Sequence, residues 1–352
     1  MAVNVLVVDD SGFMRNALSS MLSSDPDIKV IGTAQDGIEA VQKVSQLNPD
    51  VVTMDVEMPR MDGLEALRII MERHPVPVIM VSALTTEDAK ATLEALELGA
   101  VDFIPKNLDE LSANIVRIKQ VLVEKVKLVG KKGLARKDVR IDQTVTPTFV
   151  SGSVPLKHSA DRRVAIVVIG TSTGGPKALQ EVIPKLPKEF PVPIVIAQHM
   201  PPNFTQPFAD RLNQLSSVSV KEAAEGEPVC PGVVYIAPGR GHMQLLRKRG
   251  SSQNITIAIS ESGEFIYRPS VDHLCLSVAE LYAGRSLGII LTGMGNDGLK
   301  GLTAMKRGGS KIYAQNEDSC VVFGMPKAVI DAGIADKILG IDQIAGEIVN
   351  AV

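Results

Sequence analysis

The sequence predicts an α/β protein with two domains, each built on a parallel or largely parallel sheet, joined by a linker. Short β-branched runs alternate with amphipathic helical patterns over residues 1–123, and a similar pattern resumes over residues 164–352. Residues 124–163 lack this alternation. A chain of 352 residues is also long enough for two domains. Strands that alternate with helices favour parallel sheets covered by helices.

Five strand patterns alternate with five helical patterns in residues 1–123, which predicts a doubly wound, five-stranded parallel sheet. Thr85 or Thr86 is suited to cap the fourth helix, and Gly99 follows its end. The expected strands are Val3–Val8, Val30–Ala34, Val51–Met54, Pro77–Val81 and Val101–Ile104. The expected helices are Gly12–Ser23, Ile38–Leu47, Gly63–Arg73, Thr86–Glu97 and Leu108–Val129.

Residues 124–163 are rich in Lys, Arg, Ser, Thr and Pro, which predicts a linker. The net charge of −3 divides into −9 for residues 1–123, +6 for residues 124–163 and 0 for residues 164–352. The basic segment is compatible with a nucleic-acid patch or with a solvated tether that rests on an acidic domain. Because no helix-turn-helix or zinc-finger pattern accompanies it, we favour the tether.

Residues 164–352 begin with a buried strand, a glycine-rich turn and a helix, and predict a second α/β domain with a largely parallel sheet. The expected strands are Val164–Ile169, Pro193–Ala197, Val233–Ala237, Ile255–Ile259, Leu287–Leu291 and Lys311–Ala314. The expected later helices are Asn203–Gln214, Asp272–Tyr282, Asn296–Gly308 and Pro326–Ala332.

Composition narrows the location and class of the protein. No window holds the roughly 18 uninterrupted apolar residues of a membrane span, so we expect no membrane insertion. The N-terminus has no basic region of a signal peptide. Cys230, Cys275 and Cys320 are odd in number and far apart, which favours a reducing cytoplasm over a disulfide scaffold or a zinc site. Aromatic residues make up 3% and include no Trp, which argues against stacking platforms for single-stranded nucleic acid.

Charged and polar residues gather at the predicted strand ends of the first domain. Asp9 and Asp10 end the first strand, Asp55 the third and Ser82 the fourth, and Lys106 follows the fifth. Parallel strands bring these ends to one edge of the sheet. Each aspartate alone could be a turn residue or helix cap. Three clustered carboxylates instead suit Mg²⁺, and a carboxylate beside Mg²⁺ and a lysine can act as nucleophile toward a phosphoryl group.

A Gly-x-Ser-x-Gly motif lies between strand and helix in the second domain, at Gly170–Gly174. This is the setting of a nucleophile elbow, in which Ser172 projects at a helix N-terminus. The alternatives are a tight turn capped by Ser172 or Thr173, or a phosphate-cradling loop.

A nucleophilic serine needs a base and an acid that orients it. His199 follows a predicted strand and is the first candidate for the base, with His242 and His273 as others in this domain. Asp297 follows the strand Leu287–Leu291 and is the candidate acid. The remaining histidines are in the first domain and the linker and are less suited, namely His74 and His158.

The loop that carries Asp297 also fits a dinucleotide fingerprint, Gly293-x-Gly295-x-x-Gly298. We disfavour NAD binding, because Asp297 would repel a pyrophosphate. Asn296 as the helix N-cap also gives the loop an ordinary structural role.

Residues 1 to about 123 resemble a response-regulator receiver domain, through the acidic cluster, Met54-Asp55-Val56-Glu57-Met58-Pro59 and Phe103-Ile104-Pro105-Lys106. The resemblance implies that Asp55 is the phosphoacceptor, and that Ser82 and Lys106 contact the phosphoryl oxygens. Mg²⁺ would be arranged by Asp9, Asp10, Asp55 and the backbone carbonyl of Glu57. Phe103 stands where many receivers carry Tyr, so this ring can switch only by packing.

Residues from about Val164 onward resemble the catalytic domain of the CheB family of chemotaxis protein-glutamate methylesterases. The matching segments are Gly170–Gly175, Gln198-His199-Met200-Pro201, Ala237-Pro238-Gly239, His242-Met243, Pro269-Ser270-Val271-Asp272 and Leu291–Gly298. The family's triad falls on Ser172, His199 and Asp297, and its oxyanion hole on the backbone at Thr173 and Met294. No metal or cofactor is implied in this domain.

The two resemblances together imply a phosphorylation-regulated serine hydrolase of sensory adaptation. Its substrates would be glutamyl methyl esters on the cytoplasmic helices of chemoreceptors, with receptor glutamines deamidated as a second activity. A histidine kinase would be the phosphodonor, and no nucleic acid would be bound. We expect the unphosphorylated receiver to cover the esterase cleft and phosphorylation to favour an uncovered state.

Overall fold

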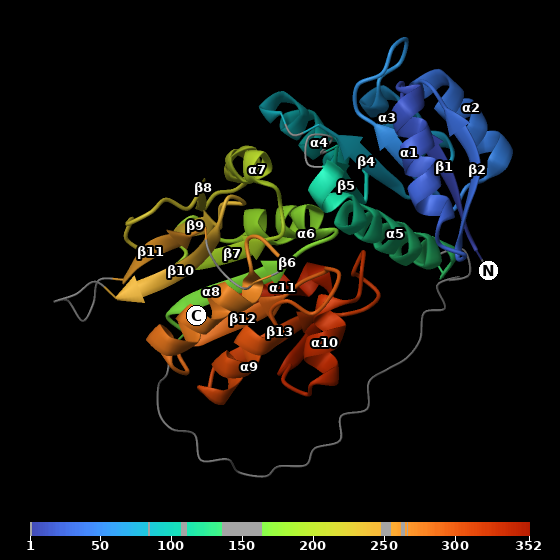
Figure 1. Ribbon diagram of the computed structural model, residues 1–352. Helices are drawn as coiled ribbons and strands as arrows, with labels where there is room; N and C mark the ends of the chain where they lie inside the picture. Colours follow the sequence, from blue (N-terminus) through green and yellow to red (C-terminus); the bar gives the residue numbers. More distant parts are fainter. Residues whose placement is uncertain are drawn as a thin grey trace.

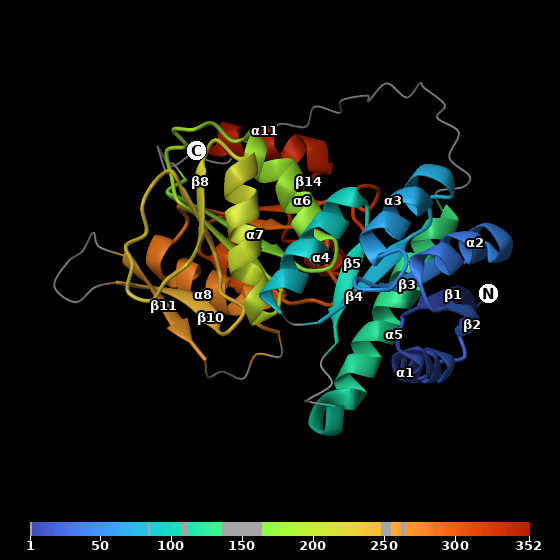
Figure 2. The same cartoon turned by 90° about the horizontal axis from the view of Figure 1, so that it is seen from above.

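The computed structural model describes residues 2–83, 85–106, 111–135, 164–247, 255–261, 265 and 267–352 (Figure 1). These residues form a five-stranded sheet, a seven-stranded sheet and a separate two-stranded ribbon. Figure 1 shows the smaller sheet with its helices at the upper right and the larger one at the lower left. The two halves meet where α4 (Thr86–Leu98) packs on α7 (Pro202–Leu215), which lie side by side in both Figure 1 and Figure 2.

The N-terminal sheet has the order β2-β1-β3-β4-β5 and all its pairings are parallel, as the sequence predicts. Thr85, rather than Thr86, caps α4, and Gly99 ends it in the left-handed region. The strands are β1 (Val3–Val8), β2 (Ile28–Ala34), β3 (Val51–Asp55), β4 (Val78–Ser82) and β5 (Asp102–Pro105). The other helices are α1 (Gly12–Ser23), α2 (Gly37–Leu47), α3 (Gly63–Arg73) and α5 (Leu111–Ala135).

Alternate residues of the central strands bury opposite faces of this sheet. Leu6 and Val8 of β1 pack with the cluster under α2, α3 and α4, whereas Val5 and Val7 pack with α1 and α5. A strand buried on both faces reads as a continuous apolar run, which is the pattern of Val3–Val8. Polar residues are therefore confined to the strand ends, where Asp9 and Asp55 lie.

The C-terminal sheet has the order β14-β13-β12-β6-β7-β9-β8, and its six pairings are all parallel. Its strands are β6 (Ile166–Thr171), β7 (Ile194–Gln198), β8 (Ser219–Glu222), β9 (Val233–Ile236), β12 (Ser286–Ile290), β13 (Lys311–Gln315) and β14 (Lys337–Leu339). The antiparallel ribbon is β10 (His242–Arg247) with β11 (Ile255–Ser260). The other helices are α6 (Gly175–Val182), the 3-10 turn η1 (Ile183–Lys185), α8 (Val271–Tyr282), α9 (Leu299–Arg307), α10 (Met325–Asp331) and α11 (Ile341–Ala351).

Helices cover both faces of this sheet. One face of β6 and β7 packs on α6, α7 and α11 through one apolar cluster, and the other packs on α8, α9 and α10 through a second. The strands β12, β6 and β7 are consecutive neighbours at the centre. Their carboxyl ends therefore bring three loops that are distant in the sequence close together.

The structure differs from the sequence prediction in several elements. Helix α5 continues to Ala135, past its predicted end at Val129 and into the segment 124–163 that we assigned to the linker; residues 136–163 lie outside the described residues. Two of its lysines bind carboxylates of the N-terminal domain, Lys125 at Asp102 and Lys127 at Asp25. The cap of α9 is Gly298, so the prediction of Asn296 as N-cap is wrong. The sequence analysis missed α11, β8, β10 and β14.

Gly301 is required where α8 and α9 cross. A Cβ there would lie 2.5 Å from the Cβ of Cys275 and 2.8 Å from the backbone oxygen of Asp272. We expect Gly301→Ala to lower the free energy of unfolding by about 1–3 kcal/mol through overpacking. The control is Gly346→Ala in α11, where nothing lies within 4 Å and helix propensity should add about 0.5–1 kcal/mol. Denaturant unfolding measures both, and equal effects would contradict the close approach.

Candidate active site and phosphorylation site

Ser172 lies on a tight turn that joins β6 to α6. Gly174 caps the helix at φ +76°, and a Cβ at Gly175 would collide with Gln198 Oε1, so both positions need glycine. The Gln198 amide donates to the backbone oxygens of Ser172 and His199, at 3.0 and 2.9 Å. Gln198 thus holds the turn to the end of the neighbouring strand. Neither Ser172 nor Thr173 caps the helix, which removes that alternative for this motif.

Ser172, His199 and Asp297 form one hydrogen-bonded chain. His199 Nδ1 lies 3.1 Å from Ser172 Oγ, and His199 Nε2 lies 2.7 Å from Asp297 Oδ2. Since the ionised carboxylate accepts a hydrogen bond from the Nε2–H group, Nδ1 is left without a proton and can accept from the serine hydroxyl. The His199 side chain is only 10% exposed and that of Asp297 6%. The structure therefore brings together the three residues that the sequence predicts.

Asp297 is held at the N-terminus of α8. Its Oδ2 accepts from the backbone N–H of Val271 at 2.8 Å, and its Oδ1 accepts from that of Asp272 at 3.0 Å. The hydroxyl of Ser270 donates to Oδ1 at 3.1 Å. Burial alone would raise the pKa of Asp297, but the hydrogen bonds from His199 and the two backbone N–H groups outweigh it and lower that pKa. The acid is thereby kept ionised beside the imidazole.

The other candidate bases lie on the far side of Asp297. His242 is fully buried, and its Nδ1 accepts from the backbone N–H of Ser270 at 3.2 Å. Its ring lies 5.5 Å from that of His273. Burial lowers the pKa of both imidazoles, so both favour the neutral form. Neither forms a hydrogen bond with Ser172 in the described part of the chain, whereas His199 does.

Tyr267 is a site residue that the sequence analysis missed. Its ring stacks on the imidazole of His199, with centroids 4.6 Å apart and planes at 7°. No local motif marks it, because it reaches the site from an irregular segment before α8.

Thr173 and Met294 lie beside the nucleophile. Ser172 N–H donates to the oxygen of Thr292, and a Cβ on Gly293 would come within 2.9 Å of Ser172 Cβ, so the two loops are in contact. Among the described residues, no hydrogen bond uses the backbone N–H of Thr173 or of Met294. Within this part of the chain, both N–H groups are therefore available as donors next to Ser172.

The dinucleotide alternative fails at the start of α9. A pyrophosphate would need the backbone N–H groups at this helix N-terminus. Asp272 Oδ1 already accepts from Gly298 N–H at 3.0 Å and from Gly301 N–H at 2.7 Å. Asp297 in the same loop is bound to α8 and His199. The groups of this loop that a pyrophosphate would need are therefore already bound by other partners.

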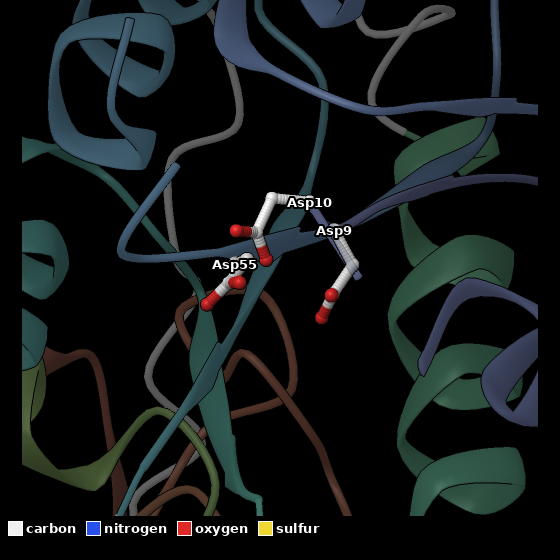
Figure 3. A group of neighbouring side chains, drawn as sticks. All are labelled: Asp9, Asp10 and Asp55. Carbon is white, nitrogen blue, oxygen red and sulfur yellow. The ribbon is translucent and has the colours of Figure 1, made fainter. Parts of the chain in front are cut away.

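The acidic cluster of the first domain lies at the carboxyl edge of its sheet. Asp9, Asp10 and Asp55 each offer one carboxylate oxygen, and these oxygens lie within 4.8 Å of one another (Figure 3). Lys106 Nζ lies 2.9 Å from Asp9 Oδ2 and 2.5 Å from Asp55 Oδ2. Burial raises the pKa of Asp55 to about 6, against the opposing effect of Lys106. Three hard oxygen donors at this spacing fit Mg²⁺.

Ser82 and Glu57 flank this cluster. Ser82 ends β4, where it pairs in register with Pro105, the residue before Lys106. Its hydroxyl accepts from the hydroxyl of Thr92 at 2.8 Å, a partner that the sequence analysis did not identify. Glu57 follows the end of β3 and its side chain is exposed, so only its backbone could serve a buried ion.

The N-terminal domain packs on the C-terminal domain close to the hydrogen-bonded chain of Ser172, His199 and Asp297. Phe103 of β5 stacks on Phe204 of α7, with ring centroids 4.6 Å apart and planes at 11°. Arg211 of α7 binds both carboxylate oxygens of Glu97 in α4, at 2.5 and 2.6 Å. Helix α7 begins three residues after His199. The contact thus lies on the element that follows the base.

The loop of Asp297 also takes part in this contact. Met294 and Val322 belong to the same buried apolar cluster as Ile104 and Val81 of the receiver. The receiver therefore contacts both α7 and the loop that carries Asp297. Separately, no helix in the described ranges combines the length and apolarity that a membrane span needs.

Comparison with known proteins accounts for both halves of the chain. Residues 5–115 match the response regulator receiver domain family, and residues 167–348 match the CheB methylesterase family. The chain is 48% identical over 369 residues to protein-glutamate methylesterase/protein-glutamine glutaminase 1 of Oleidesulfovibrio alaskensis, covering 99% of each. It is 45% identical over 354 residues to the Thermotoga maritima protein-glutamate methylesterase/protein-glutamine glutaminase, covering 99% of this chain and 98% of that one.

Among solved structures, the crystal structure of the Thermotoga maritima CheB methylesterase catalytic domain aligns with a TM-score of 0.52 and 46% identity. It covers 54% of this chain and 99% of that one. The order of receiver and catalytic domain and the full-length identities agree with the resemblance that the sequence motifs indicate. The chain therefore belongs to the CheB methylesterase family, with a response regulator receiver domain before its catalytic domain.

Proposed function

We propose that the chain is a phosphorylation-regulated serine hydrolase that removes methyl groups from glutamyl methyl esters of chemoreceptors. The observation that carries this proposal is the hydrogen-bonded chain from Ser172 Oγ through His199 to Asp297. This arrangement activates a serine hydroxyl as a nucleophile. The relatives named protein-glutamate methylesterase supply the substrate class.

The reaction is acyl transfer through the serine. His199 Nδ1 takes the hydroxyl proton as Ser172 Oγ attacks the ester carbonyl. The C–O bond to the methoxy group then breaks, and methanol leaves with the proton from His199, which gives a glutamyl ester of Ser172. Water, deprotonated by His199, attacks this ester and releases the glutamate side chain and the serine hydroxyl. Asp297 stabilises the imidazolium in both steps.

The negative oxygen formed at each step needs donors. The N–H groups of Thr173 and Met294 flank Ser172 and have no other described partner. Placed there, each would donate to the oxyanion. Deamidation of glutamine uses the same acyl-enzyme, with ammonia as the leaving group in place of methanol.

In the receiver, Asp55 is the proposed phosphoacceptor and a histidine kinase its phosphodonor. Asp9, Asp10, Asp55 and the Glu57 carbonyl would hold Mg²⁺, which neutralises charge on the phosphoryl group when bound. Ser82 and Lys106 would contact the phosphoryl oxygens. Lys106 now bridges Asp9 and Asp55, so it must exchange a carboxylate for the phosphoryl group.

The unphosphorylated receiver is proposed to restrict access to Ser172. The contacts of Phe103 with Phe204 and of Glu97 with Arg211 support this arrangement. Phosphorylation next to β5 would disfavour the packing of Phe103 and shift the population toward separated domains. Phe103 has no hydroxyl, so its role is one of packing alone.

The proposed substrate surface is the helical cytoplasmic region of chemoreceptors, which places the enzyme in the cytoplasm. Its three cysteines are free thiols, in keeping with a reducing compartment. Nucleic acid is not a proposed partner, and two lysines of α5, Lys125 and Lys127, bind carboxylates of the receiver itself.

Ser172→Ala tests the proposed reaction. We expect methanol release from methylated receptor to fall by about 10³-fold or more, since the nucleophile is lost. Ser217→Ala, an exposed serine of the same domain, is the matched control. Mass spectrometry of the receptor separates demethylation from deamidation. Activity near that of the wild type in Ser172→Ala would contradict the serine mechanism.

Tyr267→Leu tests the stack on His199. An aromatic pair contributes about 0.5–1.5 kcal/mol beyond burial, so kcat should fall about two- to tenfold. Tyr267→Phe keeps the stacked ring and should retain most of the activity. The rate at which a fluorophosphonate labels Ser172 gives a second measure. Equal losses of kcat in both variants would contradict a contribution of the ring stack to catalysis.

Arg211→Glu tests the covering contact. It replaces an exposed ion pair, worth about 0.2–1 kcal/mol, with repulsion from Glu97, so basal activity without phosphorylation should rise about two- to fivefold. Glu97→Arg in the same chain should restore the low activity. Lys221→Glu, which breaks the Lys221–Glu227 pair within the catalytic domain, is the control. A rise in the control, or none in Arg211→Glu, would count against covering by the receiver.

A further inference from the structure

The triad carboxylate has a second side-chain partner in Ser270. Ser270 is 1% exposed and lies at the N-cap of α8, immediately before the two N–H groups that hold Asp297. Its Oγ lies 3.1 Å from Asp297 Oδ1. Among the described residues, Ser270 and His199 are the two side chains that bind this carboxylate.

The direction of the Ser270 hydroxyl is fixed by its partners. An ionised carboxylate only accepts, so Ser270 must donate its proton to Asp297. The same oxygen accepts from the backbone N–H of His273 at 3.2 Å, the capping bond of α8. The backbone N–H of Ser270 donates to His242 Nδ1 at 3.2 Å. With both groups engaged, Ser270 is held as a rigid donor toward Asp297.

The two oxygens of Asp297 divide their contacts evenly. Oδ2 accepts from His199 and from Val271 N–H, and Oδ1 accepts from Asp272 N–H and from the hydroxyl of Ser270. A carboxylate bound at only one oxygen can rotate about its Cβ–Cγ bond. The pair of donors on Oδ1 therefore sets the plane in which Oδ2 faces the imidazole.

We propose that Ser270 is a positioning residue for this reaction, whose hydroxyl orients Asp297 toward His199 as the fourth member of the hydrogen-bonded chain. It acts through Asp297 and does not touch the substrate. This inference rests on the serine mechanism of the proposed function. Since a hydrogen bond to a charged group is among the stronger ones in proteins, its loss should be measurable.

The charges around Asp297 give the expected change with pH. The groups that face it are His199 from the end of β7, Asp272 and Cys275 from α8, and His242 from β10. Burial keeps Cys275 as the neutral thiol and lowers the pKa of His242, so neither supplies a compensating cation. Removing a donor from the ionised carboxylate raises the pKa of Asp297. The acid limb of the rate profile, where this carboxylate takes up its proton, should then lie at higher pH.

The experiment compares Ser270→Ala and Ser270→Gly in the full chain, activated with a small-molecule phosphodonor and Mg²⁺. Both variants lose the hydroxyl, and glycine keeps most of the N-cap preference. We expect kcat for methanol release to fall about tenfold with KM unchanged. We also expect the acid limb of the pH–rate profile to move to higher pH. Ser270→Thr, which keeps the hydroxyl, should restore both.

The matched control is Ser286→Ala. Ser286 is also 1% exposed in the same domain, and its hydroxyl bonds that of Ser310 at 2.7 Å, away from the triad. It should lower the midpoint of thermal unfolding as Ser270→Ala does, with an unchanged pH profile. A wild-type kcat and acid limb in Ser270→Ala would overturn the inference while leaving Ser172 in place. An active Ser172→Ala in the same assay would overturn both.

Discussion

The carboxylate of Asp297 at the N-terminus of α8 is the contact on which the active site depends. It satisfies helix N–H groups that would otherwise lack partners, and the positive end of the helix dipole stabilises its charge. Asp272, the second residue of α8, does the same for α9, the helix that follows Asp297. Asp272 within α8 thus caps the N-terminus of α9, and Asp297 in the loop before α9 caps the N-terminus of α8. The orientation of the Asp297 carboxylate, the proposed catalytic acid, is therefore fixed by the packing of α8 on α9.

The same sheet edge explains how a distant domain can reach this site. The serine turn, the His199 loop and the Asp297 loop follow neighbouring strands, and the receiver lies against two of these regions. Its contact on α7 uses an aromatic ring from β5, the strand that precedes Lys106. One strand therefore connects the acidic cluster to the surface of the catalytic domain. The acidic cluster and the contact with α7 are thus separated by only a few residues of the receiver.

Much of this architecture could be predicted from the sequence, because buried parallel strands are continuous apolar runs and functional residues follow their ends. Ser172, His199 and Asp297 obey that rule, as do Asp9, Asp55 and Lys106. Strands β8, β10 and β14 escaped prediction because they are partly exposed and lack such a run. The predicted cap of α9, Asn296, was wrong because the carboxylate that binds the N-terminus of this helix comes from Asp272, 26 positions from Gly298. Tyr267 and the role of Ser270 depend on contacts that no local pattern contains.

The pairing of β6 with β12 has a consequence for biosynthesis. Register joins Ile166 to Ser286, so the strand that carries the serine turn finds this neighbour only after most of the domain has been translated. Pairings of such large sequence separation form slowly, and chains fold domain by domain as they leave the ribosome. The receiver, whose strands all lie within the first 105 residues, can complete its sheet first. The N-terminal sheet can therefore be complete before β6 pairs with β12 and the loops of Ser172 and Asp297 come together.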